Sequence, residues 1–179
     1  MGSPLRPLLP DVYMLLTELM VQDLITNVIL YRRYVDDIFV ICDTDEDAKR
    51  LLKRLNTIQD HISLTCEEEK DHQLAFLDIL LCRREDGSIK RSIYRKSTWT
   101  GQYLNFHSFC QMKYNRGLVR CLFNRIQRIC TSDTMDDENK FPTDTLVENG
   151  YPLQFVNHCK KQLTPKPTVS SVLKEKHIS

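Results

Sequence analysis

Hydrophobic residues recur at intervals of three or four along five stretches of the chain, which is the spacing of an amphipathic helix. Thr44 and Asp47 resemble a helix-capping pair before one stretch, and Gly150 stands where a C-terminal cap is expected after another. The last two stretches predict a helix-turn-helix arrangement, with a kink or restart at Pro142 in its first helix. The predicted helices cover residues 8–24, 44–58, 114–129, 133–149 and 152–163.

β-Branched and aromatic residues concentrate in other parts of the chain and predict strands. Residues 31–42 are rich in them on both sides of Asp36-Asp37, which predicts a β-hairpin that turns at these two aspartates. Further strands are predicted over residues 62–67, 74–83 and 88–94, and the turn sequence Asp86-Gly87 joins the last two as a hairpin. We therefore expect an α+β fold, an antiparallel sheet with packed helices followed by an all-helical region.

Charged residues nearly balance over the whole chain, with 25 Lys and Arg against 24 Asp and Glu, but they are segregated along it. Residues 36–78 hold 12 acidic and 5 basic residues, whereas residues 83–128 hold 11 basic and 2 acidic residues. An acidic segment followed by a basic one fits a metal site beside a track for phosphates. The simpler alternative is that both segments are solvated surfaces.

The seven cysteines are odd in number and include no Cys-x-x-Cys pair, which argues against a disulfide framework and against a zinc ribbon. No apolar run reaches the roughly 18 residues that a membrane-spanning helix needs, and the first residues lack the pattern of a signal peptide. We therefore expect a soluble intracellular protein without a membrane partner, and the sequence does not distinguish nucleus from cytoplasm.

Two adjacent carboxylates at the tip of a hydrophobic hairpin are the sharpest chemical feature. Like charges repel at this spacing, so a cation is expected to compensate Asp36 and Asp37. Mg²⁺ binds through one or two carboxylates plus substrate phosphates, and a pair of such ions can stabilise in-line phosphoryl transfer. Without further context, a solvated turn is the simpler interpretation of an Asp-Asp pair.

The neighbouring motifs resemble those of a reverse transcriptase. Gly2-Ser3-Pro4 looks like the loop that positions nucleotide and template, and Tyr34-Val35-Asp36-Asp37 looks like the Tyr-x-Asp-Asp metal-binding hairpin. Phe76-Leu77-Asp78 looks like the start of the primer grip. The resemblance implies that Asp36 and Asp37 are catalytic and bind two Mg²⁺ ions, and that Tyr34 helps to position the nucleotide.

A more specific resemblance is to the polymerases of Penelope-like retroelements. It rests on Phe76 to Asp78, on Ser92-Ile93-Tyr94-Arg95-Lys96 with Thr98 and Thr100, and on Tyr103-Leu104-Asn105-Phe106. It implies a partial palm over residues 1–96 and a helical thumb over residues 97–163, with a disordered tail at 164–179. The implied activity is RNA-directed DNA synthesis, with an RNA template, a DNA primer or RNA–DNA hybrid, and deoxynucleoside triphosphates as partners.

The basic segment supplies candidate contacts to a nucleic-acid backbone, which need cations more than base-specific groups. Interleaved aromatic residues suit a hybrid or single strand, where stacking adds to charge. The alternative is that the aromatics, including a predicted core stripe from Tyr114 to Ile129, are buried and the cations only solubilise a helix. The candidate nucleic-acid contacts are Arg91, Arg95, Lys96, Lys113, Arg116, Arg120, Arg125 and Arg128.

The resemblance also predicts that this chain is catalytically incomplete. In such polymerases a first palm strand with another metal-binding aspartate precedes the Gly-Ser-Pro loop, and neither that strand nor the fingers is found in these 179 residues. We therefore expect a polymerase fragment that is inactive on its own. The alternatives are a noncatalytic nucleic-acid-binding remnant of a retroelement and a poorly folding relic.

Overall fold

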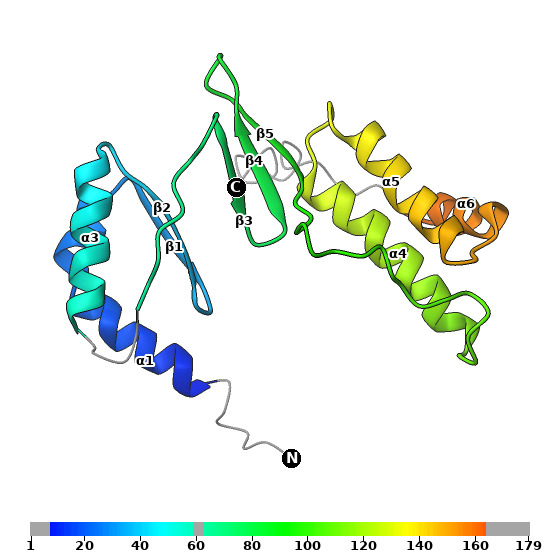
Figure 1. The fold of residues 1–179 in the computed structure, drawn as a ribbon, viewed down its shortest axis with the longest axis horizontal. Coiled ribbons are helices and arrows are strands. Elements are labelled where there is room, and N and C mark those ends of the chain that lie inside the picture. Colours follow the sequence, from blue (N-terminus) through cyan, green and yellow to red (C-terminus); the bar gives the residue numbers. More distant parts are fainter. Residues whose placement is uncertain (1–7, 59–62, 164–179) are drawn as a thin grey trace, which may run out of the picture. The chain divides into compact units, whose positions relative to one another are not determined.

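A computed structural model of the chain describes residues 8–58 and 63–163, in two compact units (Figure 1). Unit 1 comprises residues 1–69 and unit 2 residues 70–179. Each unit contains a small antiparallel sheet and packed helices, which confirms the predicted α+β class. The positioning residues Gly2, Ser3 and Pro4 and the predicted tail at 164–179 lie outside the described residues.

The first helical stretch of unit 1 is two helices, α1 (Leu8–Leu19) and α2 (Gln22–Asn27), rather than the single predicted helix over 8–24. The chain leaves helical geometry at Val21, whose φ is −123° and ψ 18°. Val21 is completely buried, in a core cluster with Leu51 and Leu55. The break therefore allows a β-branched residue to reach the core of unit 1, a tertiary effect that helical periodicity does not show.

The predicted hairpin is present as β1 (Leu30–Tyr34) and β2 (Asp37–Ile41), but it turns one residue earlier than predicted. Tyr34 pairs with Asp37, so Val35 and Asp36 form the two-residue turn. Val35 has a φ of 57°, a region that β-branched residues rarely adopt. Positive φ at the first turn position matches the twist of the flanking strands, which explains why the hairpin imposes it.

The third helix of unit 1, α3 (Asp45–Ile58), confirms both its predicted cap and its apolar stripe. The Thr44 hydroxyl donates to the Asp47 carboxylate at 2.6 Å and accepts the Asp47 backbone N–H at 3.3 Å. The prediction of a strand over 62–67 is wrong for the described residues 63–67, which form none. The Asn56 side chain instead bonds both the N–H and the carbonyl of Leu64, at 2.7 and 2.9 Å.

The sheet of unit 2 has the order β3-β4-β5, formed by β3 (Gln73–Phe76), β4 (Ile79–Arg83) and β5 (Ile89–Ile93). The single strand predicted over 74–83 is thus a hairpin with a turn at Leu77-Asp78. Leu77 adopts a φ of 53° there, and Asp78 is the single residue of a common turn type at this point of the sequence. The second turn confirms its prediction, because Gly87 has a φ of 79° and the Asp86 carboxylate accepts the Ser88 N–H.

Three helices complete unit 2, namely α4 (Met112–Ile129), α5 (Met135–Glu148) and α6 (Leu153–Lys161). The stripe predicted to begin at Tyr114 is wrong at that end, because Tyr114 is 57% exposed whereas the polar neighbour Asn115 is buried. Asn115 is satisfied there, since its side-chain oxygen accepts the Tyr151 hydroxyl at 3.0 Å. The buried core consists of Val119, Phe123, Ile126, Cys130, Leu146, Tyr151, Val156 and Cys159.

The turn between α5 and α6 has the hydrogen bonds of a Schellman cap. The Gly150 N–H donates to the Val147 carbonyl at 2.9 Å, and the Tyr151 N–H donates to the Leu146 carbonyl at 3.0 Å. Gly150 has a φ of 85°, as this cap requires. The cap places Tyr151 and Leu146 in the core together, and Pro142 is accommodated inside a continuous α5.

The hairpin of β4 and β5 is joined to the segment before α5. Arg84 Nη2 lies 2.7 Å from Asp133 Oδ2, and the Thr134 hydroxyl donates to the Arg91 carbonyl at 2.7 Å. The Thr131 hydroxyl and then Arg84 lower the pKa of Asp133 from 3.8 to about 2. These contacts fix the sheet against the helices of unit 2.

Gly150→Ala is expected to destabilise unit 2 by about 1–2 kcal/mol, because a Cβ is unfavourable at positive φ and would lie 3.2 Å from the His107 ring. Gly117→Ala is the matched control, since a Cβ there meets nothing within 4 Å inside α4. The control is expected to stabilise by about 0.5–1 kcal/mol. Urea denaturation measures both, and equal effects of the two substitutions would contradict the assigned cap.

Asp133 is expected to titrate near pH 2 in the folded chain, measured by NMR of its side-chain carboxyl. Because this pKa lies below the ordinary value of 3.8, the contacts of the Asp133 carboxylate with Thr131 and Arg84 favour folding above about pH 3.8, and their contribution is lost as the pH falls toward 2. Arg84→Ala is expected to raise the pKa of Asp133. An unchanged pKa in that variant would show that Arg84 does not pair with this carboxylate in solution.

Candidate nucleic-acid interface

The hairpin tip of unit 1 exposes both predicted metal ligands. Asp36 lies in the turn and Asp37 begins β2, and each is exposed, as is the side chain of Tyr34. Their oxygens are of the kind that Mg²⁺ prefers. Among residues 8–58 and 63–163, no group of three or more His, Cys, Asp or Glu side chains could hold a metal ion. Asp36 and Asp37 are therefore ligands of the kind that an Mg²⁺ site uses, but these two carboxylates alone are too few to complete one.

Arg33 holds this hairpin against α1. Its Nε lies 2.7 Å from Glu18 and its Nη1 3.1 Å from Asp11, and Nη1 also donates to the Val35 carbonyl at 2.9 Å. Its hydrogen bond with Glu18 is the main cause that raises the pKa of Arg33. Burial first, and then Glu18, raises the pKa of Tyr31, whose hydroxyl also donates to Glu18. Arg33 thus compensates carboxylates of α1, and it fixes the turn by its hydrogen bond to the backbone carbonyl of Val35.

The predicted primer-grip residues form the turn between β3 and β4 in unit 2. Phe76 ends β3 and is half-buried, Leu77 is exposed in the turn, and Asp78 lies 2.7 Å from Arg125 of α4. The Asp78 carbonyl also accepts the Tyr94 N–H at 2.9 Å. The structure therefore joins this motif to Arg125 of the basic segment, which lies 47 residues after Asp78 in the sequence.

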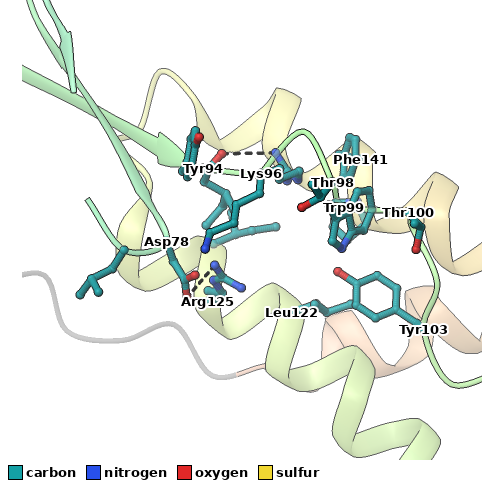
Figure 2. A pocket seen from close by; sticks show the side chains of 15 residues that line it. Asp78, Tyr94, Lys96, Thr98, Trp99, Thr100, Tyr103, Leu122, Arg125 and Phe141 are labelled. Atoms are coloured by element: carbon teal, nitrogen blue, oxygen red, sulfur yellow. Dashed lines mark hydrogen bonds and ion pairs between the residues drawn. The ribbon is translucent and has the colours of Figure 1, made fainter. Parts of the chain in front are cut away.

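A pocket of about 430 Å³ opens beside this turn (Figure 2). The turn, the end of β5, the following loop, α4 and α5 all contribute to its wall. Two of the predicted nucleic-acid contacts that line it have carboxylate partners, because Arg125 pairs with Asp78 and Arg95 pairs with Glu138 at 2.6 Å. The Arg95 guanidinium also lies 3.8 Å from the centroid of the Phe141 ring. Lys96 lines the pocket and is exposed.

Three other predicted contacts share one face of α4, which we call the α4 basic face: Lys113, Arg116 and Arg120. Spacings of three and four residues place them on one side of the helix, and all three are exposed. Arg120 donates to the neutral amide of Gln162 at 2.5 Å, which leaves its charge uncompensated by that contact. Arg128 is also exposed on α4, and Arg91 is exposed on β5.

The outward face of α6 is a further polar surface, which the sequence patterns did not single out. Four polar side chains at helical spacing are exposed on it: Gln154, Asn157, His158 and Lys161. His158 lies 2.9 Å from Gln162, which in turn contacts Arg120, so this face continues into the α4 basic face. The spacing i, i+3, i+4, i+7 could have revealed it, because Val156 and Cys159 mark the opposite, buried side.

None of the described helices is long and apolar enough to span a lipid bilayer. No curated protein and no solved structure matches the chain. Residues 102–161, which contain α4, α5 and α6, match the family of the animal helix-turn-helix domain. A domain of this type suggests nucleic-acid binding, and the match lies on the helices that carry the α4 basic face and the outward face of α6.

Proposed function

We propose that unit 2 binds nucleic acid through the α4 basic face, and that the chain is part of an RNA-directed DNA polymerase of a retroelement. The observation that supports nucleic-acid binding most directly is the presence of three exposed cations on one face of α4, within the residues that match a helix-turn-helix domain. Seven residues of helix span roughly 10 Å, so the three cations can follow a phosphate backbone. The partners would be an RNA template and a DNA primer, or their hybrid.

The outward face of α6 supplements this interface with side chains that hydrogen-bond rather than only attract charge. Gln154 and Asn157 each offer an amide donor and acceptor, and Lys161 adds a cation. The chain of contacts from Arg120 through Gln162 to His158 makes the surface continuous across α4 and α6. A nucleic-acid backbone that is bound on the α4 basic face would therefore have its neighbouring groups close to α6.

The polymerase part of the proposal rests on the resemblance of the Tyr34 to Asp37 hairpin and is supported by its geometry. The turn holds both carboxylates exposed, while Arg33 is occupied by Glu18 and Asp11. Asp36 and Asp37 would hold Mg²⁺, which when bound supplies charge stabilisation for phosphoryl transfer from deoxynucleoside triphosphates. The strained φ of Val35 is consistent with a tip whose position matters, since such strain concentrates at functional sites.

The apolar side of α1 supports the view that unit 1 belongs to a larger fold. Six large apolar side chains on one side of this helix are more than half exposed, although such a side is normally covered, whereas Met14 on another side is buried. A palm that continues beyond these residues would bury them. The exposed side chains are Leu8, Leu9, Val12, Leu15, Leu16 and Leu19.

A noncatalytic nucleic-acid-binding protein is the second candidate. The observation that favours it is the number of metal ligands at the hairpin, since the described residues bring only Asp36 and Asp37 together there. Both candidates require the α4 basic face, and they differ in whether the hairpin takes part.

Replacing Arg116 and Arg120 with alanine is expected to weaken binding of a short nucleic-acid duplex and to reduce the salt slope of log K by about 2, because each lost phosphate contact removes about 0.9. Fluorescence anisotropy at several salt concentrations measures the slope. Arg50→Ala with Arg54→Ala is the matched control, since both arginines are exposed one turn apart on α3. An equal loss of slope in both double variants would contradict the proposed interface.

Mn²⁺, used as a paramagnetic stand-in for Mg²⁺, is expected to broaden the NMR signals of residues 34–38 at millimolar concentration. Asp36→Asn and Asp37→Asn are each expected to weaken this broadening, because each removes one anionic ligand. Asp136 and Asp137 provide an internal comparison, as adjacent exposed carboxylates at the start of α5. Equal broadening around both pairs would argue for nonspecific attraction and against a metal role for the hairpin.

A further inference from the structure

The pocket of unit 2 gathers hydrogen-bond donors around an open space. In Figure 2, Lys96 and Arg125 lie toward one end of this space, Trp99 and Tyr103 toward the other, and Thr98 between them. An ammonium, a guanidinium, an indole N–H and two hydroxyls can all donate hydrogen bonds. The wall is therefore built to receive acceptor atoms.

The charges at one end favour an anion. Of the three cations that line the pocket, Arg125 pairs with Asp78 and Arg95 with Glu138, so Lys96 supplies the positive charge that no carboxylate of the described residues offsets. Arg125 Nε is buried and has no hydrogen-bond partner among the residues that the structure describes. This nitrogen has no exposed surface, so a ligand in the pocket would be held by exposed donors, of which the Lys96 ammonium is one.

The other end favours an aromatic ring. Trp99 is 37% exposed and lies with its ring centroid 5.9 Å from that of Tyr103 and 5.2 Å from that of Phe141. Gly101, with a φ of 75°, carries the loop past the indole, and its carbonyl accepts the Asn149 side-chain amide at 2.8 Å. The loop thus holds the indole in the wall, where it offers surface for stacking.

We propose that this pocket binds a nucleotide, with its phosphate toward Lys96 and Arg125 and its base against Trp99 and Tyr103. A group with a dianion at one end and a flat ring at the other matches both ends of the wall, whereas a phosphate alone or a base alone matches one. The pocket volume of about 430 Å³ is within the range of small-ligand sites. The nucleotide is either free or the terminal residue of a strand, and this site is distinct from the α4 basic face.

Trp99 is the single tryptophan of the chain, so its fluorescence reports on the pocket directly. With excitation at the red edge of indole absorption, titration with AMP is expected to change the emission saturably. Adenosine and inorganic phosphate are each expected to bind at least about fivefold more weakly, because each engages one end only. A 5′-phosphorylated tetranucleotide, compared with its unphosphorylated form, tests the terminal-residue source.

Lys96→Gln and Tyr103→Phe are each expected to weaken AMP binding by about threefold to tenfold, because the first removes the positive charge and the second removes a hydroxyl donor, both with little change in volume. Lys140→Gln is the control, since this exposed lysine of α5 lies outside the pocket wall. Circular dichroism checks that all three variants remain folded. A saturable response to AMP or to the phosphorylated tetranucleotide that weakens only in the two pocket variants supports the proposal and identifies the source.

A response that does not saturate, or one that Lys96→Gln and Tyr103→Phe leave unchanged, would overturn it. Duplex binding by the Arg116 and Arg120 variants is measured separately. A negative result for AMP binding therefore does not contradict the proposed duplex interface, and a negative result for duplex binding does not contradict the proposed nucleotide pocket.

Discussion

The buried hydrogen bond between Tyr151 and Asn115 is the constraint on which the arrangement of unit 2 depends. The Schellman cap at Gly150 directs Tyr151 into the core, and its hydroxyl meets the Asn115 side chain of α4 at 3.0 Å. Asn115 would be unfavourable at a buried position without this partner. One turn thereby fixes α4, α5 and α6 relative to each other, and both helix faces that we propose to contact nucleic acid follow from it.

Two groups of cations on unit 2 can be distinguished, those that pair with carboxylates and those that are exposed on the α4 basic face. Arg84, Arg95 and Arg125 each pair with a carboxylate and join the sheet to the helices or hold the wall of the pocket. Among the described residues, the α4 basic face makes no ion pair with a carboxylate, and the contact of Arg120 with Gln162 is to a neutral group. Because some of its cations pair with carboxylates, the segment of residues 83–128 need not be one continuous track for phosphates despite its excess of nine positive charges.

The elements whose signals are local were predictable from the sequence. The cap at Thr44, the turn at Asp86-Gly87 and the helix end at Gly150 each depend on side chains within a few residues, and each is present. The α+β class followed from the two periodicities. The motif residues Asp36 and Asp37 could be located on a hairpin tip, although the turn itself lies one residue earlier, at a valine that pattern rules would exclude.

The remaining features depend on contacts that are distant in sequence. The break at Val21 and the burial of Asn115 instead of Tyr114 are set by partners on other elements. The ion pair between Asp78 and Arg125, and with it the pocket, requires the β3–β4 turn to meet α4, which no spacing in the sequence indicates. The outward face of α6 was predictable in principle and was overlooked because polar residues at helical spacing are usually only solvated.

NMR mapping of a bound duplex on the isotope-labelled chain tests whether α4 and α6 form the nucleic-acid interface. We expect the largest changes in chemical shift on the α4 basic face and on the outward face of α6, with little change along the exposed side of α5 around Asp137 and Lys140. Changes concentrated on α5, or spread evenly over all exposed residues of unit 2, would contradict it.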